Sequence, residues 1–131
     1  MKLRVMALFG FAVAAVLSGP VAAADDQPSY SNKWRIEVSE GAKSDGLMLF
    51  RLTPKEGSAV DVTVPIKKGR SENNVAKDIR DAMKKALDPK AFHTEVDDGE
   101  DVLLKKKKGP DFAVVLVEST VDSVRINIEK E

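Results

Sequence analysis

The sequence predicts an α+β domain: a mostly antiparallel sheet of about six to seven strands with one helix packed on one face. Short runs in which apolar and polar residues alternate recur along the chain, and this period of two is typical of half-buried strands. Only residues 71–87 instead repeat their apolar positions every three or four residues, as an amphipathic helix does. Packing one helix against an antiparallel sheet buries both kinds of apolar surface.

Three strands are predicted before the helix. Residues 34–38 alternate cleanly, and residues 47–52 form a denser apolar run, so the two are expected to form a hairpin. Because residues 47–52 are apolar on both faces, we expect a central strand or one that is covered on both sides. Residues 60–66 alternate again but contain Pro65, which cannot donate a hydrogen bond to a neighbouring strand. The third strand is therefore expected to lie at an edge of the sheet or to end at this proline.

The helix has clear start and stop signals. Ser71 is a favoured N-cap residue, and Glu72 places a negative charge in the first turn, where the helix dipole favours it. Pro89 ends the helix near Leu87. The residues expected on its buried face are Val75, Ile79, Ala82, Met83, Ala86 and Leu87.

A hairpin is predicted directly after the helix. We expect residues 97–99, Asp-Asp-Gly, to form its three-residue loop, as a type I turn closed by Gly99 in the left-handed region. Thr94 then faces Val102, and Phe92 faces Leu104. All four side chains would lie on one face of the hairpin.

Two more strands complete the domain. Residues 112–117 are so apolar that we expect an almost fully buried strand, and residues 124–128 alternate once more. No linker-like or repeated segment follows the polar leader expected over residues 25–32. The sequence therefore predicts a single domain over residues 33–131.

The first residues predict a secretory signal peptide, residues 1–24. A basic start precedes an apolar run over residues 5–17, which is shorter than the roughly 20 residues that a membrane-spanning helix needs. Small residues follow, so cleavage is expected between Ala24 and Asp25; an uncleaved membrane anchor is the alternative. The expected location is periplasmic or extracellular, with no stable membrane insertion after cleavage.

The composition narrows the classes of function. The chain has equal numbers of basic and acidic residues, 21 of each, so its charge gives no support for nucleic-acid binding. It has no cysteine, which excludes a lipoprotein and disulfides and fits a bacterial envelope protein. His93 is the only histidine and has no nucleophile motif nearby. We therefore expect no enzyme activity, no metal and no cofactor.

Charged residues of the hairpin form the candidate interaction surface. The acidic residues are Asp97, Asp98, Glu100 and Asp101, and the basic ones are Lys105, Lys106, Lys107 and Lys108. Calcium binding is one interpretation of the acidic cluster, but its spacing is not that of a calcium loop, and turn chemistry explains it more simply. The lysines would bind anions or protect an edge strand from pairing with another chain.

Part of the chain resembles a short module of flagellins, hook-associated proteins and phage tail proteins. In these, a strand is followed by a helix of the pattern x-A-x-x-I-x-x-A, a hairpin, a Gly-containing turn and a final strand. The matching residues are Val62-Thr63-Val64, Ser71, Val75-Ala76, Ile79, Ala82, residues 92–104 and Gly109-Pro110-Asp111-Phe112. The resemblance covers about half of the mature chain. Unlike flagellins, this protein has a predicted cleavable signal peptide and lacks flanking coiled-coil segments. It implies a structural or interaction module without catalytic residues.

These observations predict a small secreted or periplasmic binding domain whose partner is a protein in the cell envelope or outside the cell. The alternative is an inhibitor or immunity-type protein that acts on a secreted hydrolase. An exposed apolar patch on the sheet face opposite the helix would indicate a protein partner or a dimer.

Overall fold

The computed structural model describes residues 29–131. The predicted signal peptide, its cleavage site after Ala24 and most of the predicted leader lie outside these residues. Ser31 exchanges two main-chain hydrogen bonds with Phe112, both of 3.0 Å. The elements, in chain order, are β1 (Lys33–Ser39), β2 (Gly46–Pro54), β3 (Val60–Ile66), α3 (Glu72–Ala86), β4 (Phe92–Asp97), β5 (Asp101–Lys106), β6 (Phe112–Ser119) and β7 (Arg125–Lys130).

The strands form two antiparallel sheets, with strand orders β4-β5-β1-β7 and β3-β2-β6. The α+β class and its antiparallel pairing are confirmed, whereas the expectation of a single sheet is wrong. The expected hairpin of β1 with β2 is wrong as well, because β1 pairs with β5 and β7 while β2 pairs with β3 and β6. The polar loop after β1 carries the chain from one sheet to the other, so both strands turn their apolar faces to the same core.

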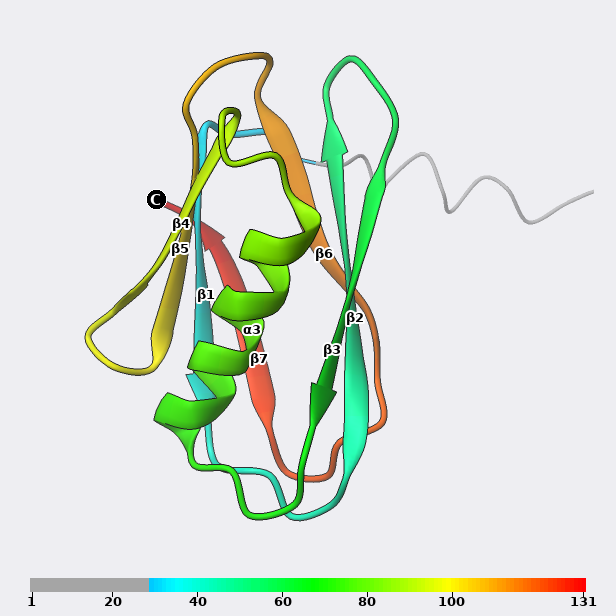
Figure 1. Ribbon diagram of the computed structural model, residues 1–131, viewed down its shortest axis with the longest axis vertical. Coiled ribbons are helices and arrows are strands. Elements are labelled where there is room, and N and C mark those ends of the chain that lie inside the picture. Colours follow the sequence, from blue (N-terminus) through cyan, green and yellow to red (C-terminus); the bar gives the residue numbers. More distant parts are fainter. Residues whose placement is uncertain (1–28) are drawn as a thin grey trace, which may run out of the picture.

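One core joins both sheets and the helix. Its fully buried side chains include Ile36 of β1, Phe50 of β2 and Leu104 of β5. The helix adds Val75, Ala76, Ile79 and Met83, which are all fully buried. It contacts β3 of one sheet and β1, β4 and β5 of the other. Figure 1 shows α3 in front, with β4 and β5 on one side and β2 and β3 on the other.

The predicted limits of the helix are confirmed. The amide of Asn74 donates a hydrogen bond of 3.3 Å to the hydroxyl of Ser71, which is the N-cap. At the other end, the amide of Leu87 donates to the carbonyl of Met83. Local signals set both ends, because capping hydrogen bonds satisfy main-chain groups that the helix itself leaves unpaired.

The β4–β5 hairpin has the predicted faces but a different register. Thr94 lies opposite Leu104 and Val96 opposite Val102, so the predicted pairing of Thr94 with Val102 is wrong by two residues. The loop is Asp98-Gly99-Glu100, one residue later than expected, and Gly99 has the predicted positive φ of 77°. A shift of two residues keeps every side chain on its face, which explains why alternation could not distinguish the two registers.

The positions of β2 and β3 in the sheet β3-β2-β6 agree with the sequence. β2 is its central strand and β3 lies at its edge, as the apolar run and Pro65 predict. The expectation that residues 112–117 are almost fully buried is wrong for the second half of β6, where Val115 and Val117 are exposed. No helix within residues 29–131 is long and apolar enough to cross a membrane.

Candidate functional site

The acidic residues at the base of the hairpin loop are engaged within the fold. The guanidinium of Arg35, on β1, donates hydrogen bonds to Asp101 at 2.6 Å and to Asp97 at 3.2 Å. It also binds both carboxylate oxygens of Glu131, at 2.7 and 3.0 Å. These hydrogen bonds raise the pKa of Arg35, and the bond from Arg35 lowers the pKa of Glu131. Asp97 and Asp101 therefore hold the sheet together rather than offering a free anionic surface.

The remaining two acidic residues belong to the turn. Asp98 has a positive φ of 52°, and the amide of Glu100 donates a hydrogen bond of 2.9 Å to the carbonyl of Asp98. Asp tolerates the left-handed region better than most residues, so its presence here follows from turn geometry. Within residues 29–131, no group of three or more His, Asp or Glu residues is arranged to hold a metal ion.

The lysines do not join the acidic residues in one surface. Lys105 and Lys106 lie at the end of β5 that is away from the loop. Because β5 lies between β4 and β1, it is not an edge strand, and edge protection is the wrong explanation for its lysines. Lys106 donates to the carbonyl of Gly109, and Lys107 donates to the carbonyl of Pro89 at 3.0 Å. Lys105 and Lys108 are exposed.

The only histidine, His93, lies on β4 with an exposed side chain. Its Nε2 atom is 3.5 Å from a carboxylate oxygen of Glu95, which is exposed as well. His93 also borders a shallow hollow beside the end of α3. The predicted surface position of this side chain is confirmed.

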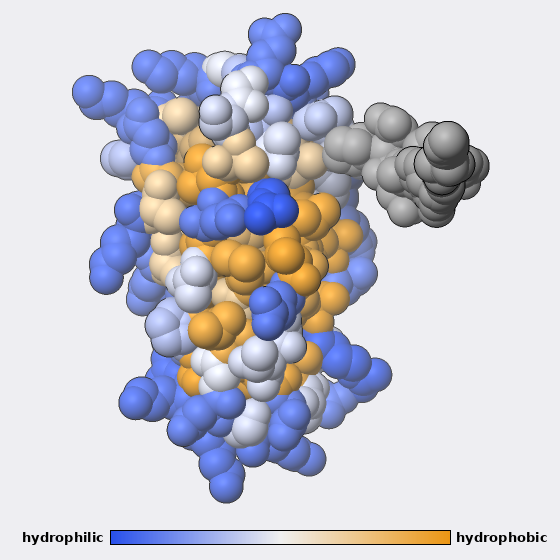
Figure 2. Space-filling view, turned by 90° about the vertical axis from the view of Figure 1, so that its right-hand side faces the viewer, coloured by the Kyte–Doolittle hydropathy of each residue, from blue (hydrophilic) through white to orange (hydrophobic). Residues whose placement is uncertain are grey.

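The outward face of the sheet β3-β2-β6 carries an exposed apolar patch. We call this surface the outer face; its side chains are Leu47, Leu49, Arg51, Asp61, Thr63, Pro65, Val115, Val117 and Glu118, which lies opposite Leu49. Leu47 is 39% exposed, Val115 47% and Val117 44%, and among the described residues these are the large apolar side chains that are exposed. Figure 2 shows apolar side chains gathered across the middle of this side of the molecule.

An ion pair crosses the outer face. Arg51 and Asp61 are directly opposite each other on β2 and β3, and their side chains make two hydrogen bonds of 2.7 and 3.1 Å. The bond from Arg51 lowers the pKa of Asp61. Because the two charges cancel, this pair adds no net charge to the outer face, whereas Glu118, opposite Leu49, adds one negative charge. Val115 lies opposite Arg51 on the other side.

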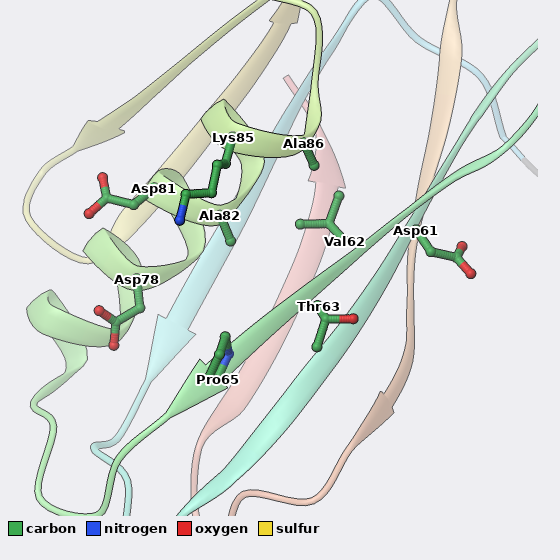
Figure 3. Close-up of a pocket in the computed structure, with 9 residues that line it drawn as sticks. All are labelled: Asp61, Val62, Thr63, Pro65, Asp78, Asp81, Ala82, Lys85 and Ala86. Atoms are coloured by element: carbon green, nitrogen blue, oxygen red, sulfur yellow. The ribbon is translucent and has the colours of Figure 1, made fainter.

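A groove of about 490 Å³ runs between β3 and α3. Asp61, Thr63 and Pro65 line it on the strand side. In Figure 3, the side chains of Ala82 and Ala86 point from the helix toward the strand. The other helical residues along it are Asp78, Asp81 and Lys85.

Sequence reasoning placed the functional surface on the hairpin and missed the outer face. Residues 47–52 did carry the signal, since they are apolar on both faces of a strand. The alternation of Val115 and Val117 with buried Val114 carried it too, but the continuous apolar run hid that alternation. A strand that is apolar on both faces is ambiguous, because the second face is covered either by the chain itself or by another molecule.

Neither known protein families nor curated proteins give a match to this chain. Its function is therefore inferred from its own surfaces. Of these, the outer face is the one on which the exposed large apolar side chains of the described residues lie.

Proposed function

We propose that this protein is an exported interaction domain that binds a protein partner in the cell envelope or outside the cell through its outer face. The observation that carries the proposal is the exposure of Leu47, Val115 and Val117 on one rigid sheet. Apolar side chains scattered singly over a surface need no explanation, whereas a contiguous patch marks a site of association.

Burial of this patch would stabilise a complex. Removing apolar surface from water contributes roughly 25 cal/mol per Å². The side chains project from paired strands, so little conformational freedom is lost on binding. Arg51 adds a residue type that is enriched in interfaces, and its charge is already paired with Asp61. The outer face thus combines an apolar centre with a polar group suited to orient a partner.

The hairpin supports this function less well than the outer face does. Its carboxylates Asp97 and Asp101 are bound to Arg35, and its lysines lie at the opposite end of β5. The resemblance of residues 60–112 to a module of flagellins, hook-associated proteins and phage tail proteins stays a prediction. It agrees with a role in protein association.

Site-specific crosslinking in cells tests the proposal. A photoreactive phenylalanine analogue replaces Val115 in one variant and Glu95, an exposed residue of β4, in the control. We expect one discrete adduct from position 115 and none of the same mass from position 95. The adduct should disappear when Val117 is also replaced by Asp. Equal adducts from both positions, or none from position 115, would refute the proposal.

Mass spectrometry of the adduct distinguishes the two candidate roles. A structural or envelope protein as the captured partner supports the interaction domain. Capture of a co-secreted hydrolase, together with stoichiometric loss of its activity on mixing, would instead support an inhibitor that uses the same face.

A further inference from the structure

The direction of the main-chain groups in β2 follows from its contacts with the end of β6. The amide of Thr120 donates a hydrogen bond of 2.9 Å to the carbonyl of Leu47, and the amide of Lys55 donates one of 2.8 Å to the carbonyl of Asp111. The odd-numbered residues of β2 therefore direct their main-chain groups toward β6. Since the groups of successive residues in a central strand alternate between its neighbours, Met48, Phe50 and Leu52 bond to β3.

This alternation determines which groups of β3 are free. Met48, Phe50 and Leu52 lie opposite Val64, Val62 and Val60, so these three valines make the ladder with β2. Asp61, Thr63 and Pro65 direct their main-chain groups the other way, toward the free edge. Pro65 therefore costs no hydrogen bond within the sheet, which explains why a proline is tolerated here.

The free edge of β3 carries main-chain donors and acceptors that could pair with a further strand. It offers the amides of Asp61 and Thr63 and the carbonyls of Asp61, Thr63 and Pro65, and β2 is the only strand that pairs with β3 among residues 29–131. Native edges are often protected by charged side chains, prolines, bulges or a covering segment. β3, with the sequence Val-Asp-Val-Thr-Val-Pro-Ile, has Asp61 and Pro65 but no lysine, and its pairing with β2 has no bulge. The amides of Asp61 and Thr63 stay available as donors.

The space beside this edge is open. The groove between β3 and α3, of about 490 Å³, borders the free main-chain groups, and the methyl groups of Ala82 and Ala86 point from the helix toward the strand. A strand added to β3 would need to lie about 4.8 Å away. Small side chains on the facing helix allow a main chain to approach this closely.

Each carboxylate in the lining of the groove already has an arginine partner. The lining contains Asp61, Asp78 and Asp81 and one cation, Lys85. The partners are Arg51, Arg70 and Arg80, which lie outside the lining. With these arginines counted, the groove has no net negative charge, so the main-chain groups of the edge, rather than charge, determine what binds there.

We propose that the free edge of β3 binds an extended segment of a partner polypeptide, which adds a strand to the sheet in the groove beside α3. This inference rests on the proposed function and names the conformation in which the partner binds. Main-chain hydrogen bonds to Asp61, Thr63 and Pro65 supply the affinity of such a complex, and alternate side chains of the added segment supply its specificity. Its outward side chains would extend the outer face.

Two substitutions at one position test the role of the main chain. Thr63→Pro and Thr63→Val both remove the hydroxyl group, but only Thr63→Pro removes the amide that points into the groove. Neither change removes a hydrogen bond to β2. Each variant of the full-length chain, purified after export, is first checked by thermal unfolding. Random linear peptides displayed on phage are then selected on the wild-type protein, and fluorescence anisotropy measures the affinity of the enriched peptides.

We expect enriched peptides that bind as an extended strand. They should bind the wild-type protein and Thr63→Val equally well but bind Thr63→Pro about tenfold more weakly or worse, because a donor and the close approach are lost together. Equal affinity for Thr63→Pro and Thr63→Val would overturn the proposal, and so would the absence of any enriched peptide.

A second pair of variants tests the groove without changing the main chain of β3. Ala86→Arg fills the groove with a long cationic side chain, whereas Asn73→Arg adds the same side chain at an exposed position of α3 outside the groove. Loss of peptide binding in Ala86→Arg alone supports the proposal, and equal binding by both variants contradicts it.

These outcomes are separable from those of the proposed function. Failure of peptide selection with a position-specific adduct from Val115 would refute strand addition and leave the outer face as the binding surface. A dimer in light scattering that Thr63→Pro dissociates, without any enriched peptide, would show that a second copy of the chain occupies the edge, and would overturn the proposed partner.

Discussion

A nitrogen of the Arg35 guanidinium lies 2.6 Å from a carboxylate oxygen of Asp101, on the neighbouring strand β5. Both side chains are mostly buried, at 17% and 14% exposure. The same guanidinium reaches Asp97 and Glu131, so one cation joins three carboxylates from β4, β5 and the end of the chain. This contact explains the acidic cluster at the hairpin without any ligand.

Replacing Arg35 by Gln should therefore destabilise the domain. The substitution leaves three neighbouring carboxylates without their shared cation. For a partly exposed network we expect a loss of about 1 kcal/mol, which lowers Tm by about 4–8 °C. Arg35→Lys should lose less, because it keeps the charge but not the planar fork that binds Glu131. A Tm of Arg35→Gln equal to that of the wild-type protein would contradict this.

The same network predicts a pH dependence. The pKa of Glu131 is lowered from its ordinary value of 4.5, first by the hydrogen bond from Arg35. A carboxylate whose pKa is lower in the folded state binds its proton more readily when unfolded. Its contribution is therefore complete above about pH 5 and lost as the pH falls through the lowered value.

The free energy of unfolding, measured in urea between neutral and acidic pH, checks this dependence. The difference between wild type and Arg35→Gln should be constant near neutral pH and shrink under acidic conditions. A difference in the free energy of unfolding that grows on acidification would contradict this prediction.

Adjacent valines in β6 should differ sharply in their contribution to stability. Val114 points into the core, with 4% exposure, whereas Val115 belongs to the outer face. We expect Val114→Ala to cost about 1.5–3 kcal/mol, from lost burial and the cavity left behind. Val115→Ala should cost less than about 1 kcal/mol. Urea denaturation measures both values, and similar losses would show that the isolated domain already covers its outer face.

Removing the N-cap of α3 should have a defined cost. The Ser71 hydroxyl accepts a hydrogen bond from the amide of Asn74, so Ser71→Ala leaves this amide without its side-chain partner. The expected loss is about 1 kcal/mol in the free energy of unfolding. Ser71→Asp restores an acceptor and adds a favourable charge at the helix N-terminus, so it should remain close to the wild-type value.

Processing of the N-terminus is open to direct measurement. Export of the full-length chain in a bacterial host should yield a protein that begins at Asp25, as intact mass and N-terminal sequencing would show. Retention of residues 1–24 in a membrane fraction would instead support the uncleaved anchor.

Local patterns in the sequence were sufficient for the elements themselves. The cap at Ser71, the apolar repeat of α3 and the alternation of β1 and β3 depend on neighbours a few residues apart, and the structure has all of them. Pro65 indicated an edge or a strand end for β3, because a missing amide is a property of the residue itself, and the structure has β3 at the edge.

Pairing between strands could not be predicted in the same way. Both registers of the β4–β5 hairpin place the same side chains inward, so the alternation of apolar and polar residues cannot distinguish between them. The observed register brings Asp97 opposite Asp101, where Arg35 of β1 binds both carboxylates. Arg35 is more than sixty residues away in the chain, and no local pattern contains that contact.

The sequence by itself determined the class of fold and the helix with its limits. It also predicted that β3 lies at an edge or ends at Pro65, and that β2 is central or covered on both sides. Only the tertiary structure decided that β1 and β2 belong to different sheets, and that the outer face of β3-β2-β6 is left uncovered. The physical reason is that an apolar side chain has the same preference for burial wherever it stands. Whether Val115 meets the core or the solvent depends on which segments, distant in the chain, are left to cover it.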